Sequence, residues 1–135
     1  MIKLNFTISE LLYSDEAKKH GINNIPNDAQ TLDNLLLLIT QCLQPIRNYI
    51  GKPIQITSGY RCKTLNELPT IKGVPNSQHT KGQAADIVIK GMTPKQVIEK
   101  IVASGIEFDQ LINEHNIWTH ISYNKNNNRR QILAA

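Results

Sequence analysis

Residues 77–87, SQHTKGQAADI, place a histidine and an aspartate in one short polar stretch. His79 and Asp86 are separated by a glycine and two alanines, which leave room for close backbone approach. A loop histidine and an aspartate at the mouth of an apolar strand can supply nitrogen and oxygen ligands to a metal ion. An aspartate buried there would be costly unless it were paired with a cation or fully hydrogen-bonded. The stretch therefore predicts a metal site.

A third candidate ligand, His120, lies in the stretch IWTHISY, where it alternates with Trp118 on one face of an expected strand. Taken alone, a histidine beside a tryptophan on an apolar strand is more often a core residue than a ligand. Together with His79 and Asp86, however, it completes a set that suits zinc. Catalytic zinc sites use three protein ligands and leave a fourth position for water, which the ion acidifies.

Five positions of the same loop match a known motif. Ser77, His79, Gly82, Ala84 and Asp86 agree with the SxHxxGxAxD pattern of the zinc D-alanyl-D-alanine carboxypeptidase family. The stretches SGYR and WTH resemble the upstream arginine segment and the downstream WxH of that family, in the same order. From FTISEL onward the chain most resembles the compact C-terminal-type domain that phages and prophages carry.

The resemblance implies that His79, Asp86 and His120 hold Zn2+. It also implies that Arg61 binds either a substrate carboxylate or the oxyanion that develops during attack, tasks that suit a planar, permanently charged guanidinium. A surface salt bridge is the alternative for Arg61. Ser77 would hydrogen-bond the substrate or brace the loop, unless it is an ordinary turn residue. The implied substrate is a peptidoglycan stem peptide.

The general base is the point at which the sequence departs from the family pattern. Better-known members carry a glutamate three residues before the last histidine, as ExxH, but here that position is an isoleucine. Glu114 is the nearest carboxylate, and it faces the same side as His120 if the hairpin loop spans 115–117. A two-residue loop would point it away. We therefore expect Glu114 to be the base, with His115 as its substitute and Asp109 as a structural residue.

The elements that must position these residues form a helical half followed by a strand half. The expected helices are short turns after the capping box TISE, a main helix over 28–50 that Pro45 should kink, and a helix over 93–105. The apolar face of the main helix is expected at Leu32, Leu35, Leu36, Ile39, Leu43, Ile46 and Ile50. The expected strands are PIQITS, AADIVI, FDQLINE and IWTHISY, with a long polar loop before the second and a hairpin between the last two. This order predicts an α+β fold, in which N-terminal helices pack on a small antiparallel sheet, and residues 1–135 should form a single domain.

Composition narrows the class of protein without fixing it. The formal charge of +4 would suit an anionic wall polymer, although ordinary solubility explains it equally well. A nucleic-acid binder is not favoured, because the only basic cluster, NKNNNRR, has no interleaved aromatic residues. Cys42 and Cys62 form no CxxC pattern, and Cys42 is expected to be buried.

The sequence shows neither a secretory signal nor an apolar run long enough to cross a membrane. We expect a monomer that is cytoplasmic on synthesis and acts at the cell wall after lysis or from a phage particle. The predicted function is a zinc-dependent peptidoglycan peptidase, either a D,D-carboxypeptidase or an endopeptidase of the stem peptide. The alternative, which the missing ExxH glutamate keeps open, is a catalytically inactive zinc-bearing wall-binding or phage structural module.

Overall fold

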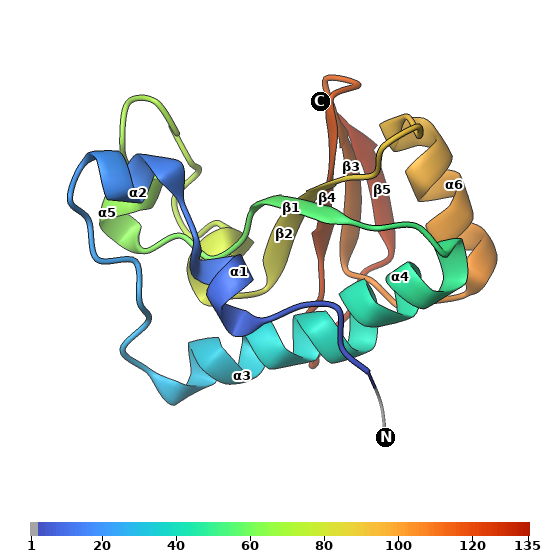
Figure 1. Ribbon diagram of the computed structural model, residues 1–135, viewed down its shortest axis with the longest axis horizontal. Helices are drawn as coiled ribbons and strands as arrows, with labels where there is room; N and C mark the ends of the chain where they lie inside the picture. Colours follow the sequence, from blue (N-terminus) through green and yellow to red (C-terminus); the bar gives the residue numbers. More distant parts are fainter. Residues whose placement is uncertain (1–2) are drawn as a thin grey trace.

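The computed structural model describes residues 3–135 and confirms an α+β fold, in which helices surround one five-stranded sheet (Figure 1). The helical segments are α1 (Ile8–Leu12), α2 (Asp15–Lys19), α3 (Ala29–Leu37), the π-helical turn η1 (Leu38–Leu43), α4 (Gln44–Ile50), α5 (Lys63–Asn66), the 3-10 turn η2 (Gln78–Lys81) and α6 (Pro94–Ser104). The strands are β1 (Gln55–Ser58), β2 (Ala84–Val88), β3 (Gln110–Glu114), β4 (Trp118–Ser122) and β5 (Gln131–Ala134). In Figure 1 the segment from α3 to α4 runs below the strands and α6 lies at their right.

Side-chain caps start the helices where the sequence predicts them. The Thr7 side chain accepts from the Glu10 N–H at 3.1 Å and caps α1. Thr93 and Gln96 form a complete capping box at the start of α6. Gly105 ends α6 with a φ of +76°, a left-handed conformation that glycine adopts without strain.

The main helix contains a π-helical turn just before Pro45. Proline has no N–H to donate, and its ring clashes with the carbonyl of the preceding turn. The Gln44 N–H donates to the Ile39 carbonyl, five residues back rather than four, and so opens a wider turn at this place. The irregularity expected at Pro45 therefore takes the form of a π-helical turn, a known cause of helix distortion.

Part of the predicted apolar face of this helix is wrong. Leu32 and Leu36 are 40% and 49% exposed. The predicted Leu35 is fully buried, but Thr31 and Asn34 share the inward face of α3 with it, and the Asn34 side chain donates to the carbonyl of Lys81 at 2.9 Å. Polar contacts with η2 thus displace the leucines to the surface. Farther along, the predicted Ile39, Leu43 and Ile46 are buried, as are Leu38 and Cys42.

The sheet has the order β1-β2-β4-β3-β5. The pairs β1–β2, β2–β4 and β3–β4 are antiparallel, as predicted, but β5 pairs in parallel with β3. β5 is not predicted from the sequence, because a strand whose side chains are all exposed shows no alternation between buried and exposed positions. The sheet is therefore mixed at this edge.

One face of the sheet packs into the apolar core, and the other carries polar side chains. Ala85 and Ile87 of β2 join Leu111 and Ile121 in the apolar core beneath the helices. The residues between them along the strands, such as Asp86 and His120, point to the opposite face, because successive side chains of a strand alternate. Core packing on one face therefore fixes polar side chains on the other. Within residues 3–135, no helix combines the length and the apolar character needed to cross a membrane.

Candidate metal centre

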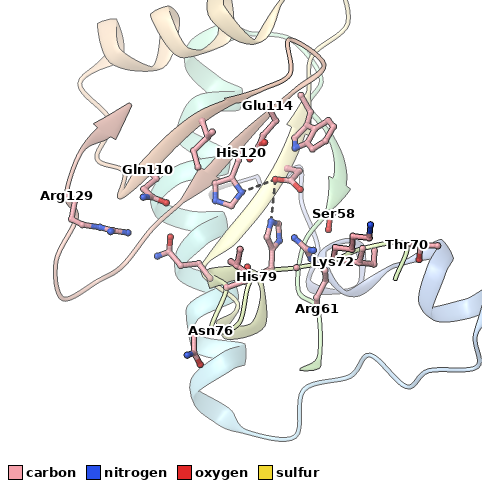
Figure 2. Close-up of a pocket in the computed structure, with 18 residues that line it drawn as sticks. Ser58, Arg61, Thr70, Lys72, Asn76, His79, Gln110, Glu114, His120 and Arg129 are labelled. Carbon is pink, nitrogen blue, oxygen red and sulfur yellow. Dashed lines mark hydrogen bonds and ion pairs between the residues drawn. The ribbon is translucent and has the colours of Figure 1, made fainter. Parts of the chain in front are cut away.

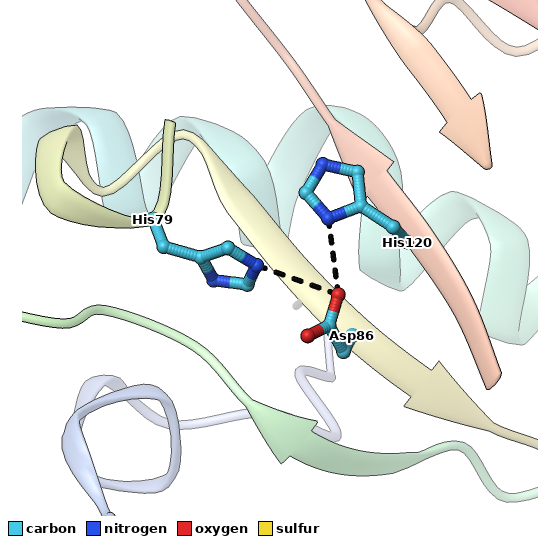
Figure 3. A group of neighbouring side chains, drawn as sticks. All are labelled: His79, Asp86 and His120. Atoms are coloured by element: carbon cyan, nitrogen blue, oxygen red, sulfur yellow. Dashed lines mark hydrogen bonds and ion pairs between the residues drawn. The ribbon is translucent and has the colours of Figure 1, made fainter. Parts of the chain in front are cut away.

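His79, Asp86 and His120 come together from η2, β2 and β4 (Figure 3). One ligand atom from each residue lies within 4.8 Å of those from the other two. Asp86 faces His120 across the β2–β4 ladder, so their side chains leave the sheet on the same face. Asp86 Oδ1 is 3.0 Å from His120 Nδ1 and 3.4 Å from His79 Nε2. The structure thus assembles the three side chains that the sequence singled out as ligands.

His79 is prepared as a neutral nitrogen ligand. Its Nδ1–H donates to the carbonyl of Gly59 at 2.7 Å, which leaves the lone pair on Nε2. Burial lowers the pKa of His79, while the Asp86 carboxylate opposes this effect, so the imidazole is neutral near pH 7. Nε2 is buried and has no hydrogen-bond partner among the described residues.

Two electron-rich atoms therefore face each other, since the lone pair of His79 Nε2 points at an oxygen of Asp86. Burial alone would raise the pKa of Asp86, but hydrogen bonding from His120 lowers it well below its usual range, so the carboxylate is ionised. A cation between the two groups relieves their repulsion. Two imidazoles and one carboxylate are zinc ligands, and the carbonyl on the far nitrogen of His79 is a typical outer partner of such a ligand. The residues present fit a zinc ion.

Gly59 holds His79 in place because its backbone packs against α1. A Cβ atom on Gly59 would lie 2.3 Å from the carbonyl oxygen of Leu11, far inside normal contact. The neighbouring Tyr60 N–H donates to the same oxygen at 2.8 Å, so the two backbones are tightly joined.

Gly59→Ala is expected to destabilise the protein by about 1–3 kcal/mol, because the added methyl group forces two backbones apart. The displaced carbonyl should also weaken zinc binding by about 10–100-fold. Urea denaturation and zinc titration measure the two effects. The matched control is Gly51→Ala, which introduces strain at a φ of +75° with nothing within 4 Å of the new methyl group. It should lower stability without changing zinc affinity; equal zinc affinities for the two variants would contradict the assignment of Gly59.

A cavity of about 620 Å³ lies over the three side chains (Figure 2). Its lining includes Arg61, Ser77 and Glu114, all predicted from the sequence as site residues. Trp118 lines it too, and its indole Nε1 is buried with no partner among the described residues. The cavity therefore brings the candidate substrate-binding and catalytic groups to the metal centre.

Arg61 is tied to the metal-binding turn through its backbone. Its N–H donates to the carbonyl of His79 at 3.0 Å. Burial lowers the pKa of Arg61, with Asp86 acting in the opposite direction, and the side-chain Nε has no partner among the described residues. A partly buried guanidinium with an unpaired donor is prepared to receive an anion. The surface salt bridge considered as the alternative is not formed in residues 3–135.

Ser77 braces the loop, as one of its two predicted roles required. Its side chain accepts from the N–H of His79 at 3.2 Å and caps η2, which begins at the next residue. Because Ser77 also lines the cavity, it is in addition available to a substrate.

The hairpin between β3 and β4 has the three-residue loop that brings Glu114 to the site. Glu114 pairs with Trp118 and lies on the same face as His120, and the loop spans 115–117. His115 lies on the exposed turn with a φ of +56°, outside the cavity lining. Its ring contacts Trp118 edge-on, with centroids 6.1 Å apart. The geometry therefore favours Glu114 over His115 as the base.

Asp109 joins two segments of the cavity wall through hydrogen bonds. It is 1% exposed and accepts from the Arg129 side chain at 2.9 and 2.8 Å and from the Gln78 side chain at 2.9 Å. Gln78 begins η2, so Asp109 links the turn that carries His79 to the C-terminal segment. Asp109 was expected to be structural, but the place of Arg129 in the cavity wall was missed. The only signal was the basic cluster NKNNNRR.

Asp109→Asn is expected to destabilise the metal-free protein by about 1–3 kcal/mol at pH 7, because the buried side chain loses the charge that strengthens its hydrogen bonds from Arg129 and Gln78. Hydrogen bonding from Arg129 lowers the pKa of Asp109, so its stabilisation is complete above the unfolded pKa of about 4 and is lost as the pH falls through the lower folded value. Urea denaturation from pH 7 to pH 3 should show the gap from wild type narrowing below about pH 4. The exposed Asp33→Asn is the control; a gap that does not change with pH would contradict this role.

Two histidines and an aspartate that could hold one ion, beside an open cavity, are the arrangement of a mononuclear zinc hydrolase. The peptidase M15 family model matches residues 4–122. The chain belongs to the peptidase M15 family, whose members are zinc-dependent metallopeptidases. Among curated proteins, no match is found.

Proposed function

We propose that this metallopeptidase hydrolyses a bond in the stem peptide of peptidoglycan. The observation that carries the proposal is that Arg61 and Glu114 line the same cavity as His79, Asp86 and His120. An anion-binding group and a carboxylate base beside a zinc site are what hydrolysis of a carboxylate-bearing peptide requires. The proposed place of action is the cell wall, reached after lysis or from a phage particle.

His79, Asp86 and His120 would hold a zinc ion, which would supply a Lewis acid and a water of lowered pKa. Glu114 takes a proton from the attacking water while the oxygen of that water adds to the scissile carbonyl carbon. The same carboxyl group then gives the proton to the leaving amine as the C–N bond breaks. Ser77 hydrogen-bonds the bound peptide while it holds the turn that carries His79.

Arg61 is proposed to bind the substrate, and Arg61→Lys tests how. We expect kcat/KM to fall by about 10–100-fold, because lysine keeps the charge but loses the planar pair of donors. Arg130→Lys, a change on the exposed surface outside the cavity, is the control. A rise in KM alone assigns Arg61 to a substrate carboxylate, and an equal fall in kcat assigns it to the developing oxyanion. Unchanged kinetics would remove Arg61 from the site.

Short stem peptides with free and with blocked C-termini identify the bond. A carboxypeptidase releases D-alanine only from the free form, whereas an endopeptidase cuts both and releases larger fragments. Mass spectrometry of the products separates these results. If the zinc-loaded protein binds peptidoglycan but cuts neither peptide, the proposed activity is wrong and the inactive wall-binding module replaces it.

A further inference from the structure

The segment that follows β4 brings a second arginine to the cavity. Arg129 and Arg61 both line it, and Figure 2 shows them on opposite sides of His79 and His120. The family match ends at residue 122, so Arg129 lies outside the matched residues.

The position of Arg129 is fixed by Asp109. Arg129 Nε donates to Oδ1 at 2.9 Å and Nη2 donates to Oδ2 at 2.8 Å. The backbone N–H of Arg129 also donates to Oδ1 at 2.9 Å. Asp109 also accepts a hydrogen bond from Gln78 at the start of η2. The position of the Arg129 guanidinium is therefore fixed relative to the turn that carries His79. An arginine on a polar tail is ordinarily free to sample many rotamers, and this one is restrained at the cavity wall.

Arg129 still has donors to offer. A guanidinium carries five N–H groups, and the bonds to Asp109 use one on Nε and one on Nη2. The remaining groups have no protein partner among the described residues, and the side chain is 44% exposed. Asp109 offsets the positive charge, so what Arg129 contributes is directional hydrogen bonding at short range. A planar fork of this kind fits a carboxylate.

We propose that Arg129 is a specificity-determining residue that binds a free carboxylate of the stem peptide, on the side of the metal centre away from Arg61. The inference rests on the proposed function. It makes the preferred substrate a peptide that extends across the metal centre and carries a free carboxylate on the Arg129 side. The carboxamide form of the same peptide, which cannot accept two parallel N–H bonds, is the poorer substrate.

The test compares two synthetic stem peptides that differ only in whether the carboxylate on the Arg129 side is free or amidated. For the wild-type enzyme with zinc, we expect kcat/KM to be about tenfold higher for the carboxylate form. In Arg129→Gln the ratio should fall to about one, and in Arg129→Lys, which keeps a cation for Asp109, to an intermediate value. Arg130→Gln, the adjacent exposed residue outside the cavity, should keep the wild-type ratio.

A purely structural role for Arg129 would lower kcat/KM for both peptides equally and leave their ratio unchanged, which would overturn the inference. A wild-type ratio of about one would overturn it as well. Calorimetric binding of both peptides to zinc-loaded Glu114→Gln, with and without Arg129→Gln, separates the two proposals. If no variant cuts either peptide but binding prefers the carboxylate through Arg129, the proposed activity fails and the inference stands.

Discussion

Asp86→Ala is expected to weaken zinc binding by more than about a hundredfold and to abolish peptidase activity, because a ligand matters more than the outer partners whose loss costs about 10–100-fold. Asp86 bridges two imidazoles, within 3.0 Å of His120 Nδ1 and 3.4 Å of His79 Nε2. Its removal leaves two imidazole nitrogens and no negative charge to balance the ion. Zinc titration with a competing chelator measures the loss directly.

Thermal unfolding gives a second measure of the same change. A ligand present at a hundred times its dissociation constant stabilises the folded state by about 2.7 kcal/mol, so zinc should raise the wild-type Tm but not that of Asp86→Ala. Asp33→Ala, on the exposed surface of α3, is the matched control and should respond to zinc like the wild type. A zinc-dependent rise in the Tm of Asp86→Ala equal to that of the wild type would contradict this ligand set.

Glu114→Gln is expected to lower kcat by about 10²–10⁴-fold while the bound zinc stays at the wild-type level. The amide keeps the shape of the side chain but cannot take a proton from water. Glu114 lines the cavity beside the three candidate ligands and does not belong to that group. Steady-state kinetics and metal analysis of the same preparation therefore separate catalysis from metal binding.

His115→Ala is the control for the base, because His115 lies on the exposed hairpin turn outside the cavity lining. It should keep kcat within about threefold of the wild type, a small effect compared with loss of a general base. A large loss in His115→Ala together with an active Glu114→Gln would reverse the assignment.

The three residues of the candidate metal centre could be singled out from the sequence, because His79 and Asp86 lie in one short stretch of the chain. His79 precedes a glycine turn and Asp86 enters an apolar strand, so the neighbouring sequence indicates the surroundings of both side chains. Strand alternation predicts the face of the strand on which His120 lies. The side on which Glu114 lies depended on one residue of loop length. In the structure, two hydrogen bonds between Asn113 and Asn116 stabilise the three-residue turn that places Glu114 on the same face as His120. Loop length decides register, and register decides which face a side chain occupies.

The features that the sequence did not predict depend on contacts between distant segments. Leu32 and Leu36 fit the apolar spacing of a helix, yet both are exposed. The inward face of α3 includes Asn34, which donates a hydrogen bond to Lys81 of η2. The place of Arg129 depends on the parallel pairing of β5 with β3 and on a buried bond to Asp109 twenty residues away. The local sequence pattern does not predict such a distant partner, because the same polar residues are typical of an ordinary solvated tail.

The most direct test of the account is a zinc titration of the chelator-treated protein, with release of new amino groups or D-alanine from purified peptidoglycan as the readout. We expect no release without zinc and full activity at one zinc per chain, which Asp86→Ala does not recover. Activity that survives complete removal of the metal, or a zinc-loaded wild type that releases nothing, would contradict it.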